Sequence, residues 1–349
     1  MLLAFLLFFV LPSASFGQRA ELRLASPVFL PGISDSNSPV HWWNGQLRVY
    51  QSAGLPIMSE GPGVMDVLKS RAIGLSDYRN TPLWIEATWL DSDGTLYAWY
   101  HNEVLTCGDL SQPRIGALVS WDGGGSFWDL GIVAETGYPP NCDAQNGYFA
   151  GGHGDFTVLL DQESRYFYFY FGNYSGPEGS QGVAVARMAF EDRAAPRGKV
   201  WKYFRGDWRE PGIGGRVTPI LPVTTVWERP DTDALWGPAL HWNTYLQQYV
   251  MLLNRTCCEP GWPVGGIYIS YSKDLGDPES WSAPQLLLGA EAAGWYPQVI
   301  GLDTGDSDKQ AGQVARFFMG SDSLYEIVFE FDEQPFSSRA GQRRQDEKR

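Results

Sequence analysis

The chain is patterned as short apolar strands joined by polar turns. In residues 147–176, GYFAGGHGDFTVLLDQESRYFYFYFGNYSG, the apolar run FTVLL and the aromatic run YFYFYFGNY stand on either side of the polar turn DQESR. Such β-branched and aromatic runs, bounded by turn residues, are typical of a tight antiparallel hairpin. Beyond the apolar N-terminus no window keeps a 3.6-residue apolar period, so strands rather than helices are expected.

The same hairpin pattern recurs along the chain. Each copy has a polar or acidic residue, an apolar strand, a turn, and a second strand that carries Tyr, Trp or Phe. The copies lie at residues 38–52, 85–103, 147–176, 237–255 and 296–320. Five copies predict an all-β, five-bladed β-propeller that forms one domain over residues 18–336.

The end of the chain predicts how the ring closes. The last repeat, from Tyr296, offers only three clear strands and ends at SLYEIVFEF, whereas residues 20–30, AELRLASPVFL, form a lone strand before the first hairpin. A propeller commonly completes its last blade with an N-terminal strand, which removes an exposed sheet edge. We expect residues 20–30 to serve this purpose.

Composition agrees with this fold and limits the ligands. The 349 residues are 44% hydrophobic and 14% aromatic, with 40 Gly and 23 Pro, which favours many short strands around a substantial core. The formal net charge of −14 argues against nucleic acid as a partner, since phosphates would be repelled. A neutral or cationic ligand is easier to accommodate.

The two ends of the chain predict export and a charged tail. Residues 1–17, MLLAFLLFFVLPSASFG, are an apolar run followed by small residues and resemble a secretory signal, although a basic start is missing. A membrane anchor is the alternative, but the run is shorter than the ~20 residues that a span needs. We expect a secreted or periplasmic protein without a stable membrane span, and a disordered tail at residues 337–349.

Export makes disulfides accessible to the four cysteines. A bridge between Cys107 and Cys142 would hold the loops on either side of the third group of strands, and a bridge between the adjacent Cys257 and Cys258 would stiffen the loop TCCEPGWP. Free thiols at 257 and 258, or pairing across to the other two cysteines, are the alternatives. The spacings do not match a zinc site.

A second recurring element is a turn. Ser120-WDGGGSF-Trp128 matches the pattern Ser-x-Asp-x-Gly-x-x-aromatic, and Ser272-KDLGDPES-Trp281 is a stretched version of it. In such a turn the Asp side chain accepts backbone hydrogen bonds and Gly permits positive φ. The pattern resembles the Asp-box of sialidases, although a sialidase has six blades and an arginine triad. We interpret Asp122 and Asp274 as turn formers and not as catalytic residues.

Three carboxylates stand at the heads of inner strands. Asp35, Glu86 and Asp155 belong to blades one, two and three, and the starts of innermost strands face one another across a propeller's central funnel. Three carboxylates in one funnel raise the pKa of one of them, which keeps it protonated near neutral pH. Strand or turn capping is the alternative for each of these residues.

This layout resembles the five-bladed propeller glycosidases of the clan that contains glycoside hydrolase family 43. The resemblance implies an Asp on blade one as base, an acidic helper on blade two and a general acid on blade three. Asp35 in DSNSPVHW, Glu86 in WIEATW and Asp155 in GHGDF match these places. The family usually has Asp on blade two and Glu on blade three, and this chain has the reverse. We therefore prefer Glu86 as the acid, Asp35 as the base and Asp155 as the helper.

The resemblance implies an exported glycoside hydrolase whose partner is an oligosaccharide or polysaccharide. Residues near the strand heads could stack on sugar faces or bond hydroxyls: Trp42, Trp43, Trp84, Trp236, Trp295, Tyr296, His41, His101, His153 and Arg255. Core packing is the alternative for each aromatic residue alone. No cofactor is required for hydrolysis.

Two other functions fit the same features. A non-catalytic glycan-binding or scaffold propeller would use the aromatic funnel without an acid and base. A lyase or lactonase would hold a divalent ion such as Ca²⁺ on the axis with His153 and the carboxylates.

Overall fold

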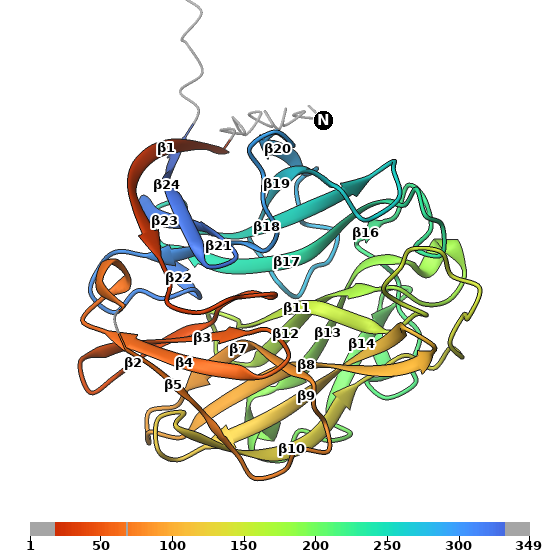
Figure 1. Cartoon of the computed structure of the whole chain (residues 1–349), viewed down its shortest axis with the longest axis horizontal. Helices are drawn as coiled ribbons and strands as arrows, with labels where there is room; N and C mark the ends of the chain where they lie inside the picture. The colour runs from red at the N-terminus through yellow and green to blue at the C-terminus, as the bar shows by residue number, and fades with distance from the viewer. Residues whose placement is uncertain (1–17, 68, 332–349) are drawn as a thin grey trace, which may run out of the picture.

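The protein is a five-bladed β-propeller, as expected from its hairpins (Figure 1). The computed structural model describes residues 18–67 and 69–331, so the signal expected at residues 1–17 and the tail expected at 337–349 lie outside the described residues. The strands form five separate sheets. Each predicted hairpin is the inner part of one of them: β2–β3, β7–β8, β11–β12, β17–β18 and β21–β23.

The first two blades follow one another in the chain. Blade one contains β2 (Val40–Trp43), β3 (Gln46–Ser52), β4 (Pro56–Gly61) and β5 (Lys69–Ala72), with the 3₁₀ helix η1 (Val64–Asp66). Blade two contains β7 (Leu83–Leu90), β8 (Leu96–Cys107), β9 (Leu110–Ser120) and β10 (Ser126–Ala134), and β6 (Gly74–Leu75) pairs with β10.

Blade three is extended by an excursion of the chain. It contains β11 (His153–Leu160), β12 (Tyr166–Asn173), β13 (Gly182–Ala189), β14 (Val200–Phe204), β15 (Asp207–Pro211) and β16 (Leu221–Pro222). The short 3₁₀ helices η2 (Glu178–Ser180) and η3 (Phe190–Ala194) flank β13.

The last two blades are linked by a short segment, because β22 lies between two strands of blade five in the chain but pairs with blade four. Blade four contains β17 (Asp233–Asn243), β18 (Gln248–Cys257), β19 (Val264–Ser272) and β20 (Gln285–Leu288), and β22 (Gln310–Ala311) pairs with β17. Blade five contains β21 (Pro297–Gly301), β23 (Val314–Met319), β24 (Asp322–Phe331) and β1 (Gln18–Phe29).

The N-terminal strand closes the ring. β1 pairs antiparallel with β24 from Gln18 opposite Phe331 to Phe29 opposite Asp322, and Figure 1 shows β1 in red beside the blue strands β24 and β23. The expectation for residues 20–30 is therefore confirmed. The ring is held shut by hydrogen bonds between the two ends of the described chain, which leaves no open edge on β24.

The alternation in blade three explains how the blades pack. Phe167, Phe169 and Phe171 face the cluster that includes Trp99 of blade two. Tyr170, on the other face of β12, belongs to the cluster shared with blade four. Because successive side chains of a strand point to opposite faces, the run YFYFYF supplies both blade interfaces at once. Each fully buried aromatic side chain contributes roughly 1.5–3 kcal/mol.

Helices play little part in the described structure. The described residues 18–67 and 69–331 hold only the three 3₁₀ helices, and none of these is long or apolar enough to cross a membrane.

Arg316 tests how the ring is closed. This buried side chain on β23 donates hydrogen bonds from Nη2 to the Ser26 carbonyl of β1 and the Ser323 carbonyl of β24, both at 3.0 Å. Arg316→Met leaves these carbonyls without their donor, and we expect it to lower the free energy of unfolding by about 2–4 kcal/mol in chemical denaturation.

The matched control is Arg23, which pairs with Glu330 across the same two strands but is half exposed. Arg23→Met should change the free energy of unfolding by less than about 1 kcal/mol, because exposed ion pairs contribute little. Equal effects of the two substitutions would contradict the role given to Arg316.

Candidate active site

Three inner strands are interrupted at the same level of the propeller. The residues left out of the regular pairing are Glu86 in β7, Asp155 in β11, and Gly237 with Pro238 in β17. An extra residue in one strand forms a β-bulge, which bends the strand and turns a side chain away from its regular face. Glu86 reaches the backbone N–H of Phe156 in blade three, and Asp155 reaches the hydroxyls of Tyr174 and Tyr296.

A cavity of about 110 Å³ opens at this end of the axis. Its walls are mainly aromatic, and its acidic groups come from blades one, two and three. The lining residues are Asp35, Trp84, His101, Glu103, Tyr148, Phe149, Asp155, Trp236, Trp262, Trp295 and Tyr296.

Asp155 is the buried carboxyl group of this cavity. Its side chain accepts hydrogen bonds from the hydroxyls of Tyr174 and Tyr296, the latter at 3.3 Å, and its backbone has a left-handed φ of 45°. Burial, reinforced by the charge of Glu86, raises the pKa of Asp155 to about 7, although His101 and the Tyr174 hydroxyl oppose the shift. Asp155 therefore exchanges a proton near neutral pH, as a general acid must.

Glu86 lies beneath the cavity and does not line it. It is almost completely buried, Oε2 accepts a hydrogen bond from the backbone N–H of Phe156 at 2.6 Å, and Oε1 lies 3.2 Å from Nδ1 of His101. Both oxygens are thus engaged by protein groups. Glu86 caps the N–H that follows the bulge in β11 and fixes the position of Asp155.

His101 connects these carboxylates. Its Nδ1 lies beside Glu86, and its Nε2 lies 3.4 Å from Oε1 of Glu103. Burial would lower the pKa of His101, but the contacts with Glu103 and Glu86 outweigh it and hold the pKa well above its ordinary value. Gly154 permits this arrangement, because a Cβ at that position would lie 2.6 Å from Cε1 of His101.

Nδ1 of His101 lies within hydrogen-bond distance of both a donor and an acceptor. The backbone N–H of Asp155 points at it from 3.1 Å and requires an acceptor, whereas the Glu86 carboxylate requires a donor. One nitrogen cannot satisfy both. The acidic groups around the ring favour the imidazolium, with Nδ1–H directed to Glu86, and the strained backbone of Asp155 is then held close to a cation.

Asp35 lies at the mouth of the cavity, in the segment before β2. Its backbone N–H donates to the Ser52 carbonyl at 2.8 Å, while its side chain stays exposed. The walls remove enough water from the carboxyl to raise its pKa, and the charge of Glu103 adds to the shift. Asp35 is therefore the more accessible of the two carboxyl groups, since Asp155 is buried.

The structure separates the predicted site residues into two groups. The cavity brings together Asp35, Asp155, Trp84, His101, Trp236, Trp295 and Tyr296. The other predicted residues do not line it. His41 bonds the Gly123 carbonyl, Trp42 bonds the Asp306 carbonyl, Trp43 lies under Arg48, His153 packs on Phe171, and Arg255 pairs with Asp233. These five side chains have structural contacts within or between blades.

Four cavity residues were not predicted: Glu103, Tyr148, Phe149 and Trp262. Glu103 could have been found, because it lies two positions after His101 on a strand and so shares its face. Trp262 could not, because its place depends on how the loop after β18 folds back. Its ring stacks on Trp227 with centroids 4.8 Å apart and meets Trp236 edge-on.

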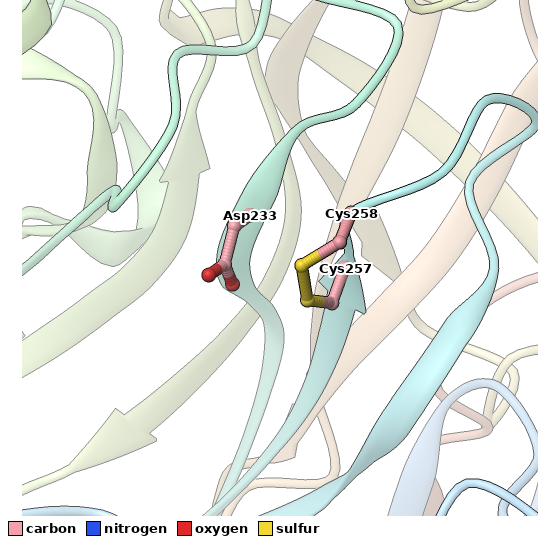
Figure 2. Close-up of side chains that lie close together, drawn as sticks. All are labelled: Asp233, Cys257 and Cys258. Carbon is pink, nitrogen blue, oxygen red and sulfur yellow. A yellow bond between two sulfur atoms is a disulfide. The ribbon is translucent and has the colours of Figure 1, made fainter.

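Two disulfides lie among the described residues. Cys107 is bonded to Cys142. Cys257 is bonded to its neighbour Cys258, and Figure 2 shows this second bridge. Cys258 has a left-handed φ of 75° and begins the loop that carries Trp262. The adjacent pair therefore shapes the base of a loop that ends as a wall of the cavity.

Two groups of side chains bring metal-ligating atoms together among the described residues. Asp233 lies beside the two bonded cysteines (Figure 2), but its oxygens accept two hydrogen bonds from Arg255, both at 2.8 Å. Glu86, His101 and Asp155 form the other group. Ca²⁺ prefers six to eight oxygen ligands, whereas this set offers an imidazole and carboxylates that are already hydrogen-bonded. His153, the expected ligand, is not in the set. These residues do not fit a calcium site.

The turn at Ser120 has the hydrogen bonds expected of it. Asp122 Oδ1 accepts from the backbone N–H groups of Gly125 and Ser126 at 2.9 and 3.0 Å. The turn lies between β9 and β10, on the outer side of blade two. Asp122 therefore has a structural role, and the relation of this turn to the sialidase Asp-box stays a prediction.

Comparison with known proteins gives the fold. No family model matches the chain, and no curated protein matches it. Among solved structures, a proposed exo-β-1,3-galactanase from Bifidobacterium bifidum s17 has a TM-score of 0.52 at 13% identity, covering 89% of this chain and 98% of that one. A thermostable family-43 glycoside hydrolase has a TM-score of 0.50 at 12% identity, covering 91% and 100%. The chain has the five-bladed fold seen in these proteins.

The buried carboxyl of Asp155 makes stability depend on pH. Its pKa is about 7 in the folded protein against an ordinary value of 3.8, so the folded state holds an extra proton between these pH values. Stability from this group is present below pH ~4 and is lost as pH rises through about 7. Asp155→Asn should remove this loss. The unfolding temperature of the variant minus that of the wild type should therefore increase as pH rises from 4 to 8.

Asp122→Asn is the control of opposite sign. Burial raises the pKa of Asp122, but hydrogen bonds from Ser126, Ser120 and Gly125 together outweigh it and lower the pKa to about 2. The carboxylate therefore stabilises the fold above pH ~4. This variant should lose stability relative to the wild type at pH 8. Parallel pH profiles for wild type and Asp155→Asn would show that Asp155 is not the protonated group.

Proposed function

We propose that the protein is a glycoside hydrolase that cleaves a glycosidic bond in the aromatic cavity. The observation that carries the proposal is Asp155, a carboxyl group with a pKa of about 7 that faces an aromatic cavity. Asp35 stands at the same cavity as a second, exposed carboxyl group. The names of the two structural neighbours, a galactanase and a family-43 glycoside hydrolase, support the same reaction class.

The proposed roles follow from position and proton affinity. Asp155 donates its proton to the leaving oxygen. Asp35, as a carboxylate, acts as the base that assists the attack of water at the anomeric carbon, where positive charge develops. The geometry supports Asp155 over Glu86 as the acid, because Asp155 lines the cavity, whereas Glu86 is not part of its lining and accepts a hydrogen bond from the backbone N–H of Phe156. Glu86 and His101 act as positioning residues that hold Asp155 and tune its pKa.

The walls suit a sugar. Trp84, Trp236 and Trp295 offer apolar ring faces, and the hydroxyl of Tyr296 and the carboxylate of Glu103 can bond sugar hydroxyls. The volume of about 110 Å³ is well below the roughly 300–1,000 Å³ of sites that enclose drug-sized ligands. We therefore propose exo action on one terminal sugar unit.

Export is part of the proposal. The apolar start of the chain resembles a secretory signal, and the Cys107–Cys142 bridge is stable in an oxidising compartment. We propose a secreted or periplasmic protein that meets glycans outside the cytoplasm.

The pH dependence of turnover tests the acid. Activity requires Asp35 ionised, above its raised pKa, and Asp155 protonated, below about 7. We expect a bell-shaped profile of kcat/KM, with a rising limb above the ordinary carboxyl pKa and a falling limb near pH 7. Full activity at pH 9 would contradict Asp155 as the acid.

Substrates with different leaving groups separate the two carboxyl groups. On an unactivated glycoside, Asp155→Asn should lower kcat about 10²–10⁴-fold, because the leaving oxygen no longer receives a proton. On a 2,4-dinitrophenyl glycoside, whose leaving group needs no proton, the same variant should keep most of its activity. Asp35→Asn should be slow on both substrates.

Glu86→Gln provides the comparison with the sequence-based assignment. If Glu86 were the acid, its variant and not Asp155→Asn would show the selective loss on unactivated substrates. If the wild type turns over no aryl glycoside or oligosaccharide but binds sugars in calorimetry, the protein is a glycan-binding propeller and the hydrolase proposal is wrong.

A further inference from the structure

A second cavity lies at the opposite end of the propeller axis. Its lining residues lie near the carboxyl ends of the inner strands β7, β11 and β17, whereas Trp84, Asp155 and Trp236 of the first cavity lie toward the amino ends of the same strands. Its volume is about 330 Å³, and its lining includes Thr88 and Trp89 near the end of β7, Val158 to Asp161 at the end of β11, and Trp242 near the end of β17. The segment 305–310 covers one side.

The second cavity is separate from the candidate active site. Asp155 and Asp161 lie six residues apart on and just after β11, which corresponds to about 20 Å of extended chain. A ligand in the second cavity therefore cannot reach the carboxyl group of Asp155, and the two cavities share no lining residue.

Three polar atoms of this lining have no hydrogen-bond partner among the described residues: Oγ1 of Thr88, Nε1 of Trp89 and Oδ2 of Asp161. Thr88 is 2% and Asp161 is 6% exposed. Asp161 Oδ1 accepts from the N–H of Arg165 at 2.6 Å, whereas Oδ2 makes no hydrogen bond and lies 3.9 Å from Nε of the exposed Arg165 side chain. Buried polar groups are normally bonded, so these atoms mark a place where a ligand's hydroxyls can bind.

The remaining lining defines the ligand's chemistry. Trp89 and Trp242 give apolar ring surfaces, and Gln162, Ser164 and Gln310 give polar groups at the open side. A purely apolar ligand would leave Oδ2 of Asp161 without a hydrogen bond, which is costly for a buried polar atom. An anion would be repelled by Asp161, and the single cation, Lys309, is already paired with Asp308.

We propose that this second cavity is a carbohydrate site that holds one neutral sugar unit. A sugar presents hydroxyls that donate to Asp161 and accept from Trp89 Nε1–H, while its C–H face packs on a tryptophan ring. The volume of about 330 Å³ lies at the lower end of the range for enclosed ligand sites. The site does not depend on hydrolysis in the other cavity.

The indole N–H resonances of Trp89 and Trp236 report on the two cavities separately. Each is assigned by its loss in the variant Trp89→Phe or Trp236→Phe, and the full chain is titrated with D-galactose, D-glucose, D-xylose and L-arabinose in ¹H–¹⁵N spectra. We expect at least one of these sugars to shift the Trp89 resonance in a saturable way. Thr88→Val and Asp161→Asn should each weaken that affinity about tenfold, by removing one hydrogen bond.

The Trp236 resonance is the matched control, because its Nε1 also has no partner among the described residues but lines the other cavity. Its titration should be the same in Thr88→Val, which also shows that the variant is folded. A Trp89 resonance that none of the four sugars shifts, or an affinity unchanged in both variants, would overturn the proposal. The experiment measures sugar binding and not turnover. Its result therefore stands even if the hydrolase proposal is wrong.

Discussion

The site depends on one arrangement of buried charge, the imidazole of His101 among the carboxyl groups of Glu86, Glu103 and Asp155. Buried charges are tolerated only when they are paired and hydrogen-bonded. Here the ring takes part in the pairing of two carboxylates, so that the remaining one, on Asp155, is the group whose pKa shifts toward neutrality. The bulges in β7 and β11 fall at Glu86 and Asp155, two members of this arrangement. Gly154 leaves room for the third, because a Cβ there would lie 2.6 Å from Cε1 of His101.

The propeller fold allows such an arrangement without disrupting the packing between the blades. Five blades pack through aromatic and aliphatic faces, and around the axis side chains from several blades meet outside the regular pairing of the strands. Polar residues gather there at both ends, with aromatic rings around them. The two cavities share an architecture but differ in chemistry. One concentrates titratable carboxyl groups, and the other presents unpaired hydrogen-bonding atoms and one carboxylate.

Much of this could be predicted from the sequence, and the errors have physical causes. The hairpins and the closing strand follow from local alternation, and Asp35, Asp155, Trp236 and Tyr296 were expected in the funnel because they stand at strand heads. Glu86 was expected there for the same reason, but its carboxylate turns beneath the cavity to meet the N–H of Phe156 on the next blade. That contact joins residues from two blades and leaves no local signal.

The sequence by itself determined the number of blades, the order of the strands and the aromatic character of the interfaces, because turn residues and a period of two act within a few neighbouring residues. Only the tertiary structure decided which carboxyl group faces the cavity and holds a proton. A bulge shifts the register by one residue and so reverses the direction of a side chain, and a pKa depends on the burial and charge that other blades supply. Short-range sequence patterns therefore determine the fold, whereas the chemistry of the site depends on contacts between segments that are distant in the sequence.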